Sequence, residues 1–167
     1  LKYIEGDPRF KGLQHDTRSI IFAWATKEFK NLELARTANV RVPKPITVKN
    51  NVLVMEFIGE DGVSAPSMKE APPKNPAKTY DTLLAYLRKL YSKAQLVHGD
   101  LSEYNIMIWR GRPVLFDMSQ AVLTSHPMAE SFLRRDLTNL NKYFIRRGIE
   151  VPPVEECYKR VTASGKA

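Results

Sequence analysis

The chain has 167 residues, of which 43% are hydrophobic and 26% are charged, as is typical of a globular protein with one core or two small lobes. It has no apolar run near the roughly 18 residues of a membrane span, and its single cysteine excludes an internal disulfide and favours a reducing, cytoplasmic setting. The net charge of +8 is compatible with binding to RNA or another polyanion, although lysines that only solvate the surface would give the same excess.

The first part of the chain predicts a loop over residues 1–14 followed by one long helix. Asp16 and Thr17 offer an N-cap for a helix of about twenty residues. Apolar residues and one acid then recur at steps of three and four, which places them on one face: Ile21, Ala25, Glu28, Leu32 and Ala35. Glu28 is therefore a charged group in an apolar stripe, and by default such a carboxylate reaches solvent or pairs with a neighbour.

Two strands are predicted next, over residues 46–48 and 52–58, around a turn at 49–51. The prolines before them exclude a helix over residues 40–45, because each biases its predecessor toward extended geometry. Residues 59–76 contain two glycines and four prolines and are expected to form a loop.

Three more helices are expected. Residues 78–94 follow the helical period closely and predict a core helix. Pro127 can open another helix, which Gly148 would close. Residues 149–167 carry little signal, although a short helix is expected after Pro153 and the last six residues are expected to fray.

The stretch from Val97 to Asp117, VHGDLSEYNIMIWRGRPVLFD, predicts a β-hairpin. Residues 106–109 and 114–116 are rich in β-branched and aromatic side chains, and 110–113 would be a four-residue connection. A hairpin brings its outer ends together, so Asn105 should lie near Asp117, with Asp100 at the same corner.

An amide oxygen and two carboxylates at one corner would suit Mg²⁺, which prefers hard oxygen ligands and few protein groups. Asp and Asn also cap turns and strand ends, so the spacing of Asp100 and Asn105 alone would be structural in most proteins. The hairpin, Asp117 and the preceding His98 together favour a catalytic interpretation.

These residues resemble a known fold. A His-x-Asp-x-x-x-x-Asn string followed by a strand-ending Asp is similar to the catalytic loop and metal-binding Asp of the protein-kinase-like fold. The chain departs from ordinary kinases at Ser102, where they have Lys, and at Met118, where they have Phe. The strings HGDLSEYN, FDMSQAV and HPMAESFLRRD resemble the RIO family of atypical kinases, and KEFKNL, VRVPKP and VLVMEFIGEDG resemble its Rio1 branch, in an archaeal form.

The resemblance implies an α+β fold of the bilobal, protein-kinase-like RIO type. Residues 1–58 would be the remaining part of the N-lobe and residues 59–167 a reduced C-lobe. No Gly-rich loop or Lys-bearing strand precedes the first helix, and residue 1 is Leu rather than Met. We therefore expect that this sequence begins inside the N-lobe and has feeble nucleotide affinity by itself.

The resemblance also assigns roles in phosphoryl transfer. Asp100 would orient or deprotonate the acceptor, Asn105 and Asp117 would hold Mg²⁺ or Mn²⁺, and Asp117 would also be catalytic. His98 is expected to pack and steady the loop, and Asp136 to brace the loop from below.

A second group of residues is expected to bind the ATP. Glu28 would be the helix glutamate that pairs with the phosphate-binding lysine. Met55 would be the gatekeeper, the Glu56 carbonyl and the Ile58 amide would bond to adenine, and Met107 would form the floor beneath it.

The implied function is that of a RIO-type serine/threonine kinase and ATPase that acts in maturation of the small ribosomal subunit. An aspartyl-phosphate intermediate on Asp117 is expected. The expected partners are ATP and the precursor of the small ribosomal subunit, both its RNA and its proteins. No association with a membrane is expected. Two alternatives remain: a small-molecule phosphotransferase of the aminoglycoside or choline kinase type, and a non-catalytic scaffold that binds the ribosomal precursor.

Overall fold

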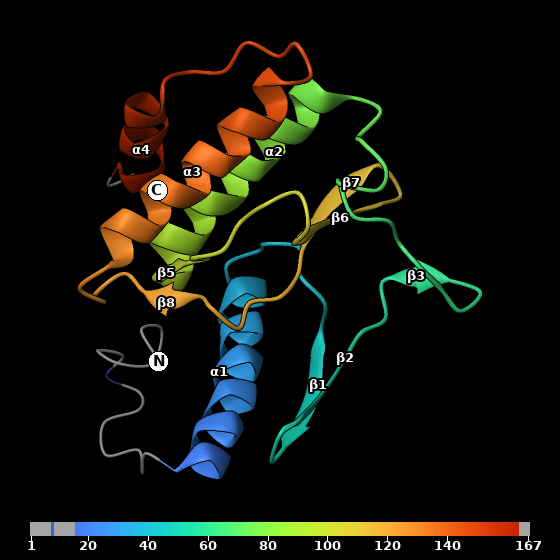
Figure 1. Cartoon of the computed structure of the whole chain (residues 1–167), viewed down its shortest axis with the longest axis vertical. Helices are drawn as coiled ribbons and strands as arrows, with labels where there is room; N and C mark the ends of the chain where they lie inside the picture. Colours follow the sequence, from blue (N-terminus) through green and yellow to red (C-terminus); the bar gives the residue numbers. More distant parts are fainter. Residues whose placement is uncertain (1–7, 9–15, 164–167) are drawn as a thin grey trace.

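A computed structural model describes Pro8 and residues 16–163 (Figure 1). The loop predicted over residues 1–14 and most of the expected frayed end thus lie outside the described residues, Pro8 excepted. The helices are α1 (Thr17–Thr37), α2 (Pro76–Lys89), the π-helical η2 (Leu90–Ala94), α3 (Ala129–Ile145) and α4 (Val154–Thr162). The strands form four antiparallel pairs: β1 (Pro45–Lys49) with β2 (Val52–Met55), β3 (Gly59–Glu60) with β4 (Val63–Ser64), β5 (Leu96–Val97) with β8 (Val122–Leu123), and β6 (Ile106–Trp109) with β7 (Arg112–Leu115).

The long first helix is confirmed, but its buried face differs from the predicted stripe. The Asp16 side chain caps α1 by accepting a hydrogen bond from the Ser19 amide at 3.0 Å. Ile21 is 46% exposed, whereas Lys27 and Asn31 are fully buried. Hydrophobicity alone could not identify this face, because these two polar side chains are buried against backbone carbonyls that satisfy them.

Three predictions about the strands were wrong in detail. β2 ends at Met55 instead of continuing to residue 58, and the segment expected to be a loop contains the short pair β3–β4. The β6–β7 connection has two residues instead of four, because Arg110 and Gly111 both adopt positive φ, 49° and 73°, which lets a two-residue turn join the strands.

The later helices begin within two residues of the predicted positions, although the helix predicted to reach residue 94 ends as α2 at Lys89 and continues as the π-helical η2. α2 begins at Pro76, since the Asn75 side chain accepts a hydrogen bond from the Lys78 amide and Pro suits the first helical position. α3 begins at Ala129 rather than Pro127, and the short helix after Pro153 is confirmed as α4.

The helices pack around one main core. In Figure 1, α2 and α3 lie side by side, α4 lies against them, and α1 runs beside the β1–β2 pair. The largest buried side chains of this core include Leu32, Leu83, Ile106, Leu115 and Phe144. Since both strands of the β6–β7 hairpin contribute to the core, the ends of that hairpin are held firmly.

Two segments from outside the hairpin bond to its edges. The Leu115 amide donates to the Arg41 carbonyl at 3.0 Å on one side. On the other, the Met68 amide donates to the Ile106 carbonyl at 2.7 Å, and the Ile108 amide to the Pro66 carbonyl at 2.9 Å. The part of the chain that follows β2 is therefore fixed against the hairpin.

The division of the chain into an N-lobe and a C-lobe at residue 58 stays a proposal. Within the described residues no helix is long and apolar enough to cross a membrane.

Candidate active site

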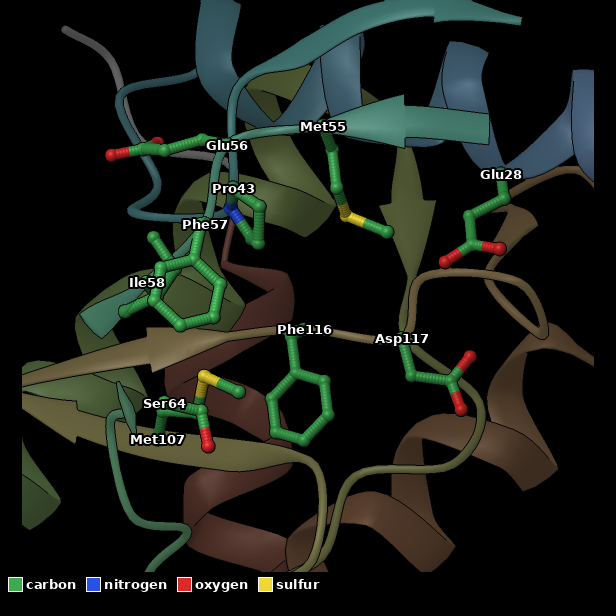
Figure 2. A pocket seen from close by; sticks show the side chains of 10 residues that line it. All are labelled: Glu28, Pro43, Met55, Glu56, Phe57, Ile58, Ser64, Met107, Phe116 and Asp117. Carbon is green, nitrogen blue, oxygen red and sulfur yellow. The ribbon is translucent and has the colours of Figure 1, made fainter. Parts of the chain in front are cut away.

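A cavity of about 550 Å³ lies between β2, the segment after it, and the β6–β7 hairpin (Figure 2). This volume is within the range of small-molecule sites. Six residues expected from the sequence line it, namely Glu28, Met55, Glu56, Ile58, Met107 and Asp117. Four other lining residues were not predicted: Pro43, Phe57, Ser64 and Phe116. Figure 2 shows Glu28 and Asp117 on one side of the cavity and the apolar side chains on the other, so a ligand would meet both a polar and an apolar wall.

The Glu56 side chain points out of this cavity (Figure 2). Its carboxylate accepts two hydrogen bonds from Arg41, both at 2.8 Å, and one from the Lys44 amide at 3.0 Å. The predicted role of Glu56 concerned its carbonyl, and among the described residues no hydrogen-bond donor to that carbonyl is found. The Ile58 amide likewise finds no acceptor there, so both backbone groups can bond to a ligand.

The loop that carries Asp100 is braced from below by Asp136 of α3. The buried Asp136 carboxylate accepts from the Gly99 amide at 2.8 Å and from the Leu101 amide at 2.9 Å. Burial raises the pKa of Asp136, although the nearby His98 and these two hydrogen bonds act in the opposite direction. The bracing role predicted for Asp136 is confirmed in these contacts.

His98 is fully buried, and its Nδ1 accepts from the Asp100 amide at 3.4 Å. Within the described part of the chain its Nε2 has no hydrogen-bond partner. An imidazole with no exposed surface cannot reach a substrate, which agrees with the expected packing role.

Asp100 and Asn105 lie together at the start of the hairpin. The Asn105 amide nitrogen donates to the Asp100 carbonyl at 2.8 Å and to its carboxylate at 3.3 Å. The same carboxylate accepts from Gln120 at 3.1 Å. The Asn105 carbonyl accepts from the Phe116 amide at 3.1 Å, which brings Asn105 next to the strand end that carries Asp117. Neither Asp100 nor Asn105 lines the cavity itself.

Asp117 has a left-handed backbone, with φ of 54°. A residue with a β-carbon rarely adopts this conformation, and such strain gathers at functional sites. One carboxylate oxygen, Oδ1, accepts from the Ser119 hydroxyl at 2.6 Å. No described residue donates to Oδ2, so one oxygen of Asp117 is available to a ligand.

The carboxylates of Glu28 and Asp117 are close enough for their negative charges to interact. Burial raises the pKa of Glu28, the negative charge of Asp117 raises it further, and Lys27 acts in the opposite direction. Since the Asp117 carboxylate disfavours the negative charge of Glu28, a cation bound between the two side chains would relieve the repulsion.

Helix α1 also clamps the segment that follows Asp117. The Lys27 ammonium donates to the Ser119 carbonyl at 2.7 Å and also to the Ala121 carbonyl. The Asn31 amide donates to the Met118 carbonyl at 2.8 Å and to the Ala121 carbonyl at 3.1 Å. Because Glu28 follows Lys27 in the same helix, this clamp also sets where Glu28 stands relative to Asp117.

The oxygen atoms left available in this site fit a hard cation such as Mg²⁺. Since the Asn105 nitrogen is committed to Asp100, the Asn105 oxygen remains as an acceptor, and Asp117 offers Oδ2. Amide and carboxylate oxygens are the ligands that Mg²⁺ takes, with water and phosphate completing its shell. No cluster of three or more His, Cys, Asp or Glu side chains that could hold a metal occurs among the described residues, so a metal would depend on the ligand's own oxygens.

Several of the residues just described were missed by sequence reasoning. Lys27 and Asn31 carry no apolar signal, and nothing in the sequence marks Ser119 as a partner of Asp117. Phe116 could have been found, because side chains two apart in a strand share a face and Val114 pairs with Met107.

The comparisons with known proteins agree with this geometry. A profile of the RIO domain matches residues 1–157. The chain belongs to the RIO family. It is 49% identical over 148 residues to the RIO-type serine/threonine-protein kinase Rio1 of Haloferax volcanii, covering 89% of this chain and 51% of that protein. It is 41% identical over 161 residues to the Rio1 of Methanocaldococcus jannaschii, covering 96% of this chain and 55% of that protein.

The fold is confirmed by solved structures of the same family. The Rio2 kinase of Chaetomium thermophilum superposes with a TM-score of 0.71 and 28% identity, covering 87% of this chain and 47% of that chain. A complex of that kinase with ADP, Mg²⁺ and phosphoaspartate gives a TM-score of 0.68 and 27% identity, covering 87% of this chain and 46% of that one. The RIO chain described here thus spans about half the length of these relatives.

Proposed function

We propose that this RIO domain is the catalytic part of an ATP-dependent serine/threonine kinase and ATPase that acts in maturation of the small ribosomal subunit. The observation that carries the proposal is the cavity of about 550 Å³, with apolar walls at one end and Glu28 and Asp117 at the other. Relatives named as Rio1 kinases support the activity, and the Rio2 complex with ADP and Mg²⁺ supports ATP and Mg²⁺ as the ligands.

Each residue then has a role in phosphoryl transfer. Met55, Met107 and Phe116 enclose the base, and the Glu56 carbonyl and Ile58 amide bond to its edge. Mg²⁺ held by Asn105 and Asp117, when bound, compensates the charge of the phosphates.

Asp100 and Asp117 act on the phosphoryl group itself. The Asp100 carboxylate, oriented by Gln120 and Asn105, accepts the proton of a serine hydroxyl or of water. In the ATPase cycle, one oxygen of the Asp117 carboxylate attacks the γ-phosphorus, the bond to ADP breaks, and water later hydrolyses the aspartyl-phosphate.

Phosphate labelling tests this proposal. The chain extended to the full length of its Rio1 relatives should take up labelled phosphate from ATP in an acid-stable, hydroxylamine-labile form. Asp117→Asn should abolish that label, because an amide cannot form an acyl phosphate. Asp81→Asn, a matched change at an exposed position of α2, should leave it unchanged.

Two results would overturn the proposal. Survival of the label in Asp117→Asn would exclude Asp117 as the acceptor. Absence of labelling and of ATP hydrolysis in the extended chain would favour the scaffold alternative. Membership of the RIO family already favours this proposal over an aminoglycoside or choline kinase.

A further inference from the structure

A second concave surface lies between α2 and the tip of the β6–β7 hairpin. Two adjoining cavities, of about 410 and 430 Å³, share Tyr86, Arg110 and Arg112 in their walls. Neither has an Asp or Glu in its lining, and neither shares a residue with the cavity that contains Asp117. We call this surface the hairpin-tip groove, and its defining residues are Lys78, Tyr86, Trp109, Arg110 and Arg112.

The two-residue turn brings cations and an indole together in this groove. Trp109 pairs with Arg112 across the hairpin, and directly opposed residues project from the same face of a strand pair. The Arg110 guanidinium lies 5.1 Å from the centre of the Trp109 ring. Tyr86 of α2 forms the opposite wall: burial raises its pKa, whereas the positive charge of Arg112 lowers it, as expected if the two are close.

The groove has positive charge that the protein does not neutralise. Among the described residues, Lys78 and Arg112 take part in no ion pair. Arg110 is 3.5 Å from Glu60, but both side chains are largely exposed, at 72% and 66%, so this pair is weak. Arg41, at one edge of the groove, forms an ion pair with Glu56, so its charge is neutralised and does not add to the positive charge of the groove. The two unpaired cations and Arg110 therefore give the groove a net positive charge.

We propose that the hairpin-tip groove binds single-stranded RNA, with phosphates on Lys78, Arg110 and Arg112 and a base against the exposed part of Trp109. Surfaces that bind single strands combine a cationic track with aromatic rings on which bases stack. An acidic peptide would satisfy the cations but would leave the aromatic wall without a planar partner.

Two adjoining cavities suit successive unpaired nucleotides better than a duplex, because the bases of a single strand can be splayed out into pockets whereas those of a duplex stay stacked. The choice of RNA over DNA rests on the proposed action on a ribosomal precursor, whereas the groove itself is independent of the ATP cavity.

Fluorescence anisotropy with a labelled 12-nucleotide single-stranded RNA tests the proposal on the 167-residue chain. The double variant Lys78→Gln/Arg112→Gln should raise Kd at least tenfold at low salt. It should also make the dependence of log Kd on log salt concentration less steep by about 1.4, because each lost phosphate contact on a single strand removes about 0.7. The matched control, Lys30→Gln/Lys142→Gln, removes the same charge from exposed sites on α1 and α3 and should change Kd less than twofold.

Equal losses in the two double variants would show that the net charge, not the groove, attracts RNA, and would overturn the proposal. Absence of RNA binding by the unaltered chain would do the same. Unlabelled oligoglutamate and single-stranded DNA of the same sequence serve as competitors, and displacement by oligoglutamate as effective as that by RNA would assign the groove to an acidic peptide instead. Displacement by DNA equal to that by RNA would contradict the choice of RNA.

Tryptophan fluorescence gives a second measurement. The chain has two tryptophans, so Trp24→Phe leaves Trp109 as the only one. RNA should quench its emission, and an unchanged spectrum at saturation would contradict stacking at Trp109. Asp117→Asn should bind RNA normally, which separates failure of this inference from failure of the proposed ATP chemistry.

Discussion

Glu56 shows how one side chain can fix the geometry of the proposed ATP site without pointing into it. Its carboxylate bonds to Arg41 and to the Lys44 amide, both in the segment between α1 and β1. These charge-assisted bonds, above all those from Arg41, lower the pKa of Glu56 to about 2. The backbone groups proposed to bond to adenine are thereby tied to the segment that follows α1.

This pair should stabilise the protein in a pH-dependent way. Because the pKa of Glu56 is lower in the folded state, its contribution is complete above the ordinary value of 4.5 and is lost as the pH falls toward 2. After discounting for solvent exposure, we expect about 1 kcal/mol. Glu56→Gln should therefore lower Tm by about 2–4 °C at pH 7 and by roughly half as much at pH 3, measured by thermal melts. Glu60→Gln, in the exposed pair with Arg110, is the control and should change Tm by no more than about 1 °C at both pH values. An equal decrease in the Tm of Glu56→Gln at both pH values would contradict this account.

Among the secondary-structure elements, α1 holds the segment that directly follows Asp117. Its Lys27 and Asn31 bond to the carbonyls of three residues, Met118, Ser119 and Ala121. Glu28 stands between these two clamping residues and faces the cavity. A shift of α1 would therefore move Glu28 and the loop after Asp117 together.

The clamp predicts a large effect from a small change. Asn31→Ala should lower the free energy of unfolding by about 2 kcal/mol, because it removes two buried hydrogen bonds worth roughly 1 kcal/mol each. Urea denaturation measures this value. Lys30→Ala, on the exposed face of the same helix, should change it by less than about 0.5 kcal/mol. A loss of similar size in both variants would mean that the clamp contributes nothing specific.

Across the whole molecule, the two strand pairs β1–β2 and β6–β7 have the same topology but different surroundings. β6–β7 is bonded at both edges, by Arg41 and by the segment of Pro66 and Met68, and its side chains enter the core. β1–β2 lies beside α1 and leaves large apolar side chains exposed, including Ile46 at 60% and Val52 at 57%.

Hydrogen exchange should separate these two pairs. Local opening costs less where few buried contacts must be broken, so amides of β1–β2 should exchange faster than those of β6–β7. Mass spectrometry of peptides covering residues 45–55 and 106–115 makes the comparison within one sample. Equal protection of both peptides would show that the edges bonded to β6–β7 do not stabilise it.

The sequence by itself was sufficient to predict the helices and the β6–β7 hairpin, because these elements depend mainly on interactions between residues close together in the chain. The helical period and the capping residues predicted where α1, α2 and α3 form, and Pro153 predicted a short helix at α4, although the buried face of α1 was not the predicted one. The residue string from His98 to Asp117 predicted the hairpin and the corner where Asp100 meets Asn105, because a tight turn fixes which strand ends meet.

Only the tertiary structure decided the rest. Lys27 and Asn31 looked like surface residues, and they are buried because distant carbonyls accept their hydrogen bonds. The left-handed backbone of Asp117 and the short β3–β4 pair, joined by a two-residue turn at Asp61 and Gly62, were not predicted, because neither leaves a periodic pattern in the sequence. The hairpin-tip groove likewise exists only because α2 packs beside β7, since its cations come from segments more than thirty residues apart along the chain.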